Sequence, residues 1–461
     1  MRSILLPVTF AGLVVLAAGG LARADVPPAD ASAPRLTVER YQLDNGLEVI
    51  LHPDPAVPLV AVDLWYHVGS GDETPGKSGY AHLFEHMMFQ GSANTGEDVH
   101  FSTLRKIGAS TVNGTTNTDR TNYFEVVPAH QLETALRLES DRMGYLLPVL
   151  TQKSLDNQRD VVRNERRQRY DSVPYGLDRF ATAAALYPEG HPYRYLTIGR
   201  HEDLAVASVD DVKAFFKTWY VPANATLILA GDFDPTAARA LVAKWFAGFP
   251  RSVKPLRRDV PMPSVKASRQ VLDDPFARLR RVHYVWQSAR IFTPGDAELD
   301  LLSSILARPG TGRLYQLLVH EKQLAQSVDA WQASAQLAST FNIVVDLKSD
   351  AEQAEVERLL DAEIERVRTE VVTPRELTRA VTQIEASFIW GLETVMARAE
   401  VLQRYNHYLG RPDAIADDLT RYRVARPTDL LKVAARTLQR DKRVEIISIP
   451  APAAMPAGGG K

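Results

Sequence analysis

The stretch SGYAHLFEHMMFQGS, residues 78–92, places two histidines four residues apart with a glutamate between them. Residues four apart lie on the same face of an α-helix, so His82 and His86 can both direct a ring nitrogen at one metal ion. Glu85 lies on an adjoining part of that face, close enough to hold a metal-bound water but offset from direct ligation. The pattern therefore predicts a zinc site with Glu85 as general base.

Zinc that acts on a substrate has three protein ligands and one open position. The chain contains no cysteine, so the third ligand must be another histidine or a carboxylate. Carboxylates on downstream helices are the first candidates, among them Glu165 in LDNQRDVVRNERRQRY. Several arginines surround Glu165, and they are either a solvated helix face or include one side chain that orients the glutamate. The alternative for the motif itself is a surface helix that carries two histidines by accident.

The composition is that of an ordinary globular protein. The chain has 461 residues, 45% of them hydrophobic and 24% charged, and this length predicts two or three domains. The formal net charge of -2 gives no reason to expect nucleic acid or an anionic membrane as a partner. The absence of cysteine also excludes disulfides and thiolate catalysis.

The N-terminus is typical of an exported protein. One early charge, Arg2, precedes an apolar run that ends at the small-x-small sequence of residues 22–24, which predicts a signal peptide over 1–24. An uncleaved membrane anchor is the alternative. Residues 25–36 are proline-rich and predict a loose mature N-terminus, and no later stretch is apolar enough to span a membrane. We therefore expect export, to the periplasm, without an integral membrane span after signal cleavage.

The order of predicted elements indicates two halves. Apolar-rich runs joined by Asn45-Gly46 predict a β-hairpin, and the run from Leu59 predicts a further strand. The metal motif opens a helix, a Thr/Asn/Tyr-rich strand pair follows, and then come longer helices. Four prolines mark 249–268 as a linker. The domains expected are 37–248 and 269–450, followed by a disordered tail, 451–461.

The two halves carry a weak internal repeat. Segments 207–231 and 425–449 share a helix of the same length that leads to a strand at a constant offset. Since strands and helices occur in the same order in each half, the sequence predicts an α+β protein built from two similar α/β halves.

Beyond the motif, the flanking residues closely resemble a known family. The order His-x-x-Glu-His marks the inverted zincins, and GYAHLFEHMMFQGS is similar to the pitrilysin/insulinase family in its processing-peptidase-like branch. The resemblance covers nearly the whole mature chain. It includes VDLWYHVGSGDE, GASTVNGTTNTDRTNYFEVVP, WYVPANATLILAGDF and GRLYQLLVHEKQLAQSV.

This resemblance implies specific roles for individual residues. His82 and His86 match the two histidine ligands of one zinc ion per chain, Glu85 matches the catalytic base, and Glu165 in RNERRQRYD matches the third ligand. Asn113 falls where the family has an edge strand that pairs with the extended substrate backbone. The implied fold has two α/β halves, each a mixed and largely antiparallel sheet packed with helices. Together they form half of a clam-like chamber that admits unfolded peptides.

Two departures from the family pattern affect the predicted function. Where the family has a second glutamate that assists catalysis, this chain has Gln158, a possible outer partner of the site that cannot accept a proton. Where active chains carry an Arg and a Tyr that contact substrate, this chain has His320 and Gln326. It therefore resembles the catalytic subunit of a two-chain zinc endopeptidase, whose paralogous partner would supply the Arg/Tyr pair.

Two other functions remain open at this stage. One is a non-catalytic scaffold or assembly subunit, against which the intact set of His82, Glu85, His86 and Glu165 argues. The other is a peptide-binding subunit that keeps zinc but turns over weakly, which Gln158 would favour.

Overall fold

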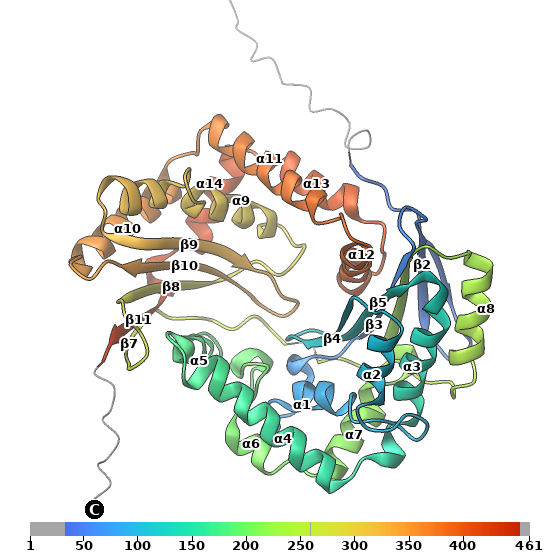
Figure 1. Cartoon of the computed structure of the whole chain (residues 1–461). Coiled ribbons are helices and arrows are strands. Elements are labelled where there is room, and N and C mark those ends of the chain that lie inside the picture. Colours follow the sequence, from blue (N-terminus) through green and yellow to red (C-terminus); the bar gives the residue numbers. More distant parts are fainter. Residues whose placement is uncertain (1–32, 259, 452–461) are drawn as a thin grey trace, which may run out of the picture.

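Two mixed β-sheets with their helices make up the part of the chain that the computed structural model describes, residues 33–258 and 260–451. The first sheet has six strands and the second has five. Figure 1 shows them in separate halves of the molecule. This arrangement confirms the predicted α+β fold with two similar halves. The predicted signal peptide 1–24, and all but the first residue of the predicted tail, lie outside the described residues.

The first sheet has the order β1-β2-β6-β3-β5-β4, which leaves β4 at one edge. Its neighbouring strands are antiparallel except for β2 and β6, which run parallel. The central strands β3 and β6 are covered on both faces, and this explains why their sequences LVAVDLWY and ATLILAG are nearly continuous apolar runs. The strands are β1 Glu39–Gln42, β2 Glu48–Pro53, β3 Leu59–Tyr66, β4 Thr111–Thr116, β5 Thr121–Pro128 and β6 Ala225–Gly231.

The helices of the first half begin at recognisable caps. Thr151, Ser208 and Asp234 each accept a hydrogen bond from a backbone N–H of the first turn of α4, α7 and α8, respectively. The helices are α1 Tyr80–Met87, α2 Val99–Lys106, α3 Leu132–Tyr145, α4 Gln152–Arg166, α5 Gly176–Leu186, α6 His201–Ala205, α7 Val209–Trp219 and α8 Pro235–Phe246.

The second half has a sheet of order β7-β11-β8-β10-β9, with β9 at one edge. Its strands are β7 Ser268–Asp274, β8 Arg281–Ser288, β9 Ala325–Ala333, β10 Ser339–Leu347 and β11 Val444–Pro450. Its helices are α9 Asp296–Ala307, α10 Gln353–Thr369, α11 Pro374–Trp390, α12 Val395–Leu409, α13 Ile415–Arg423 and α14 Pro427–Thr437. Among the described residues, no helix has the length and apolarity needed to cross a bilayer.

The internal repeat appears in the topology of both halves. In the first half α7 leads into β6, which pairs in parallel with β2. In the second half α14 leads into β11, which pairs in parallel with β7. In each half, therefore, a late helix leads into a strand that returns beside one of the first strands of that half.

Helix α12 belongs to the second half in sequence but covers a face of the first sheet (Figure 1). Leu402 packs in an apolar cluster with Ala61 and Ile228 of that sheet. The buried amide of Gln403 donates hydrogen bonds of 3.0 and 2.8 Å to the carbonyl oxygens of Asp63 and Thr226. The apolar packing of Leu402 holds α12 against the sheet, and the hydrogen bonds of Gln403 to backbone carbonyls fix its rotation.

We expect the docking of α12 to contribute measurably to stability. Leu402 is fully buried, so Leu402→Ala should lower the free energy of unfolding by about 2–5 kcal/mol through lost burial and a residual cavity. Leu409→Ala on the same helix is the matched control, because Leu409 is exposed and its loss should change stability by less than about 0.5 kcal/mol. Urea unfolding of the two variants provides the comparison, and equal effects would contradict this account of the interface.

Candidate active site

Helix α1 carries the three residues of the predicted metal motif, and its first turn is fixed by a carboxylate. Glu73 accepts hydrogen bonds from the backbone N–H groups of Gly79 (3.0 Å) and Ala81 (2.8 Å), which have no partner within the helix. Gly79 has a φ of +89°, and a Cβ there would lie 2.8 Å from the Cα of Gly199. The start of α1 is therefore held by hydrogen bonds and by a backbone contact that only glycine permits.

Helix α4 brings Glu165 to the two histidines of α1. The Oε2 atom of Glu165 lies 3.6 Å from Nε2 of His82 and 3.4 Å from Nε2 of His86. Zinc bonds of about 2.0–2.2 Å in a tetrahedral site place ligand atoms about 3.3–3.6 Å apart. In both histidine–glutamate pairs the donor atoms thus have the spacing of two ligands on one zinc ion.

The protonation preferences of two of these groups, His82 and Glu165, agree with metal ligation. Burial, reinforced by the neighbouring His86, lowers the pKa of His82 to about 4, so its imidazole is neutral at neutral pH. Burial acts to raise the pKa of Glu165, but the hydrogen bond to His86 and nearby positive charges lower it overall. A neutral imidazole and an ionised carboxylate are the forms that bind a metal.

Glu85 lies beside the histidines and is held by the neighbouring strand. A carboxylate oxygen of Glu85 and one ring nitrogen from each of His82 and His86 all lie within 4.8 Å of one another. The hydroxyl of Thr116, at the end of β4, donates a 2.6 Å hydrogen bond to Oε2 of Glu85. Burial raises the pKa of Glu85 above its ordinary value, while the Thr116 hydrogen bond counteracts this rise.

Two further side chains contact the ligand residues. Gln158, buried on α4, has its Oε1 atom 3.3 Å from Nδ1 of His86, so it can accept that N–H and leave Nε2 for a metal. Arg169 forms a 2.8 Å ion pair with Oε1 of Glu165, which favours the interpretation that one arginine orients the glutamate. Thr116 and Glu73 carried no signal in the sequence, because their contacts depend on how strand and helices pack.

Asn113 lies on β4, the edge strand beside the motif. Four consecutive residues, 113–116, line a cavity of about 430 Å³ together with His82, Glu85, His86 and Glu165. Within the described residues β4 pairs on one side only, with β5. Its free edge therefore presents unpaired backbone groups to the cavity that contains the motif.

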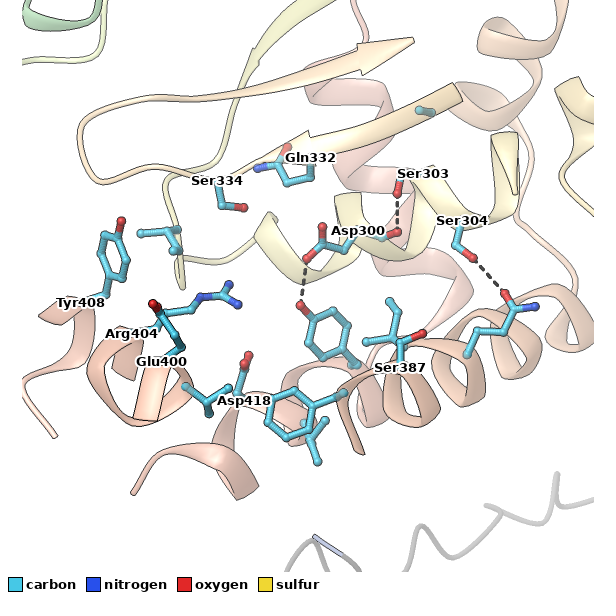
Figure 2. A pocket seen from close by; sticks show the side chains of 18 of the residues that line it. Asp300, Ser303, Ser304, Gln332, Ser334, Ser387, Glu400, Arg404, Tyr408 and Asp418 are labelled. Carbon is cyan, nitrogen blue, oxygen red and sulfur yellow. Dashed lines mark hydrogen bonds between the residues drawn. The ribbon is translucent and has the colours of Figure 1, made fainter. Parts of the chain in front are cut away.

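A larger cavity, of about 910 Å³, lies between the two halves on the other side of the turn that joins β4 and β5. Its walls come from α9, α11, α12 and α13, with Asn117 and Arg120 of the turn contributing from the first half. Figure 2 shows polar groups along these walls, among them Asp300, whose pKa burial raises to about 7. The turn after β4 thus separates two cavities. The exposed side chains of His320, in the helical turn Tyr315–Glu321, and Gln326, on β9, do not line the cavity at the motif.

A second histidine–carboxylate group lies behind the wall of the site. His100, Glu125 and Glu139 are buried, and their ligand atoms are within 4.8 Å of one another. Arg142 already neutralises Glu139, with which it makes two hydrogen bonds. Its guanidinium lies over the ring of Phe89, which lines the motif cavity. We therefore interpret this group as a buried ion-pair network that supports the cavity wall.

Comparisons with known proteins agree with this geometry. The sequence model of the insulinase family (Peptidase family M16) matches residues 48–186, and the model of the Peptidase M16 inactive domain matches 207–384. The chain belongs to the M16 (insulinase) family of zinc proteases. The first of these models covers the motif on α1 together with Glu165, and the second covers most of the second half.

Relatives of this M16 protease extend over nearly its whole length. It is 29% identical to the zinc protease PqqE of Helicobacter pylori over 412 residues, which is 86% of this chain and 89% of that protein. A crystal structure of a protease from Helicobacter pylori aligns with a TM-score of 0.82 at 25% identity, covering 90% of this chain and all of that one. The first half of the periplasmic protease PqqL from Escherichia coli shares the fold, with a TM-score of 0.76 at 18% identity, covering 92% of this chain and 94% of that one.

The buried Glu139–Arg142 pair should matter to the stability of this M16 protease. Arg142→Met leaves Glu139 buried without its partner, and we expect this change to lower the free energy of unfolding by about 3–5 kcal/mol. Arg358→Met is the matched control, because Arg358 pairs with Glu355 at the same helical spacing but on the surface; there the loss should stay below about 1 kcal/mol. A comparison of denaturant midpoints tests this. Similar losses of stability in the two variants would show that burial does not make the Glu139–Arg142 pair more important to stability than the exposed pair.

Proposed function

We propose that this M16 protease is an exported zinc endopeptidase that hydrolyses peptides or short unfolded proteins. The observation that carries the proposal is the convergence of Glu165 on the Nε2 atoms of His82 and His86 beside the buried carboxylate of Glu85. The donor set of two imidazoles and one carboxylate suits zinc, with one position open. One zinc ion per chain, held by these three residues, completes the site.

Each neighbouring residue then has a definable task. A bound zinc ion would supply Lewis acidity, which polarises a peptide carbonyl and acidifies water. Glu85 accepts the proton of the attacking water and passes it to the leaving amide nitrogen, and its burial raises its pKa toward the range that suits such a transfer. Thr116 restrains the carboxylate of Glu85, and Gln158 orients the ring of His86.

The free edge of β4 gives the site a way to bind an extended peptide. An added strand pairs with exposed backbone groups and needs no particular side chain, which suits substrates of varied sequence. Asn113 lies on that edge, within the cavity that the ligand residues line. A peptide paired with residues 113–116 would therefore have its backbone beside Glu85.

The assembly and location belong to the same proposal. His320 and Gln326 cannot replace an Arg/Tyr pair in substrate contact, so a paralogous subunit that carries this pair would complete the enzyme as a heterodimer. The predicted signal peptide 1–24 supports export, and PqqL of Escherichia coli, of similar fold, is described as periplasmic. We further propose the division into halves 37–248 and 269–450, joined by 249–268.

Two substitutions separate metal binding from base catalysis. Glu165→Ala removes a ligand, so the purified protein should lose most of its bound zinc and its peptidase activity together. Glu85→Gln keeps all three ligands, so bound zinc should stay near one per chain while kcat falls by about 10²–10⁴-fold. Metal analysis and cleavage of a quenched peptide are the measurements. Normal turnover by Glu85→Gln, or zinc loss without activity loss in Glu165→Ala, would overturn the assignments.

The two-chain hypothesis predicts weak activity for the chain alone. Cleavage of a quenched peptide should rise by on the order of tenfold or more when a paralogous M16 chain that has the Arg/Tyr pair but lacks His-x-x-Glu-His is added. Zinc content should not change on mixing, because all three ligands belong to this chain. Full activity from the purified chain without a partner would reject the heterodimer while leaving the peptidase function in place.

A further inference from the structure

Asp119, in the turn between β4 and β5, gathers hydrogen bonds from both halves of the molecule. Its carboxylate is almost completely buried. One oxygen accepts the hydroxyl hydrogen of Tyr193, and the other accepts from the hydroxyl of Tyr408 (2.9 Å) and the backbone N–H of Gln336 (3.0 Å). Tyr408 lies on α12 and Gln336 in the turn between β9 and β10. A single carboxylate of the first half thus holds two elements of the second.

Two neighbours reinforce this junction. The hydroxyl of Tyr193, while donating to Asp119, accepts a 3.0 Å hydrogen bond from the backbone N–H of Leu337. Arg257 donates 2.6 Å hydrogen bonds to the carbonyl oxygen of Asp119 and to the side-chain oxygen of Gln336. Arg257, in the segment 249–268 between the halves, therefore binds the same two turns that Asp119 joins, the β4–β5 turn and the β9–β10 turn.

The two turns belong to the two edge strands. β4 is one edge strand of the first sheet and β9 is one edge strand of the second, and each leads directly into one of the joined turns. Figure 1 shows the turn between β9 and β10 reaching toward β4. Because the turns meet at Asp119, this carboxylate directly links the ends of β4 and β9.

The junction also borders both cavities. Thr116, which holds Glu85, is separated from Asp119 by two residues, and residues 113–116 line the cavity at the motif. Asn117 and Arg120 of the same turn line the larger cavity, as does Tyr408, which Figure 2 labels on its wall. The junction therefore lies between the cavity at the motif and the larger cavity between the halves.

We propose that Asp119 is a positioning residue of this peptidase, which fixes β4 relative to β9 so that a long extended peptide contacts both halves while its scissile bond lies beside Glu85. The inference rests on the proposed peptidase function for its purpose, but the fixed orientation itself is measurable without catalysis.

The chemistry of the junction requires a carboxylate. Three donors point at Asp119, namely two hydroxyls and one backbone N–H. An asparagine has one acceptor oxygen, so its NH₂ group would face either the Tyr193 hydroxyl, which could then no longer donate to this side chain, or the pair of donors formed by Tyr408 and the Gln336 N–H. Asp119→Asn therefore preserves size but leaves at least one of these buried contacts unmade. Tyr408→Phe removes one donor and keeps the other two, which makes it a graded companion variant.

The first experiment measures orientation directly. The chain has no cysteine, so Lys153→Cys on α4 and Lys322→Cys before β9 provide one exposed labelling site in each half. Spin labels at these sites should give one narrow distance distribution in the otherwise unchanged chain. Asp119→Asn should broaden or shift it, and Tyr408→Phe should do so less. Asp350→Asn, at an exposed aspartate, should have no effect. An unchanged distribution in Asp119→Asn would overturn the proposal.

The second experiment uses two quenched peptides that share one cleavage segment. A peptide of about eight residues spans little more than β4, whereas one of roughly 25 residues extends on the order of 80 Å and reaches the second half. Asp119→Asn should lower kcat/KM for the long peptide by on the order of tenfold more than for the short one, with bound zinc retained. An equal loss for both, or loss of zinc, would mean that Asp119 is merely structural. If the unaltered protein cleaves neither peptide, alone or with the paralogous chain added, the proposed function fails, and the distance measurement alone decides the role of Asp119.

Discussion

The contact of Glu165 with the two histidines of α1 is the constraint on which the rest of the structure depends. Its Oε2 atom lies 3.4 and 3.6 Å from two imidazole nitrogens, across a junction between helices far apart in sequence. A shift of α4 along α1 by about 1 Å would move Glu165 out of the position in which it and the two histidines can bind the same metal ion. Both helices must therefore be fixed at several points. Glu73 holds the start of α1, Phe84 packs against Phe216 and Tyr220, and the fully buried Val162 anchors α4 in the same core.

The two carboxylates at the site differ because their surroundings differ. Glu165 faces two imidazoles and Arg169, and these lower its pKa. Glu85 is more deeply buried and has a neutral hydroxyl as its hydrogen-bond donor, so desolvation raises its pKa. Groups whose pKa values are pushed apart in this way are suited to separate roles, one as a permanently ionised ligand and one as a proton acceptor. The assignment of ligand and base thus follows from the environment as well as from the motif.

The sequence was sufficient to predict the parts of the site that depend on local periodicity. His82, Glu85 and His86 share a helical face because of their spacing, and the apolar runs of β3 and β6 predict buried strands. Glu165 was one of several downstream carboxylates until the family resemblance singled it out. The contacts of Thr116 and Asp119 could not be predicted, since they join strands, turns and helices whose proximity is decided by tertiary packing. The position of α12 could not be predicted either, because only the folded chain shows that Leu402 and Gln403 match the first sheet.

The two halves share a topology but have diverged in chemistry. In each sheet one of the two edge strands, β4 or β9, leads into a turn at the centre of the molecule, and these two turns meet at Asp119. Beside β4 lie two imidazoles and two carboxylates, whereas β9 lies beside a broad polar cavity. In this duplicated fold the metal motif lies beside the edge strand β4. The edge strand β9 is then free to contact the distant parts of a peptide substrate. This division of roles between β4 and β9 requires that the two strands keep a constant relative orientation. This explains why a buried carboxylate with three donors, which costs free energy to desolvate, is placed where the two halves touch.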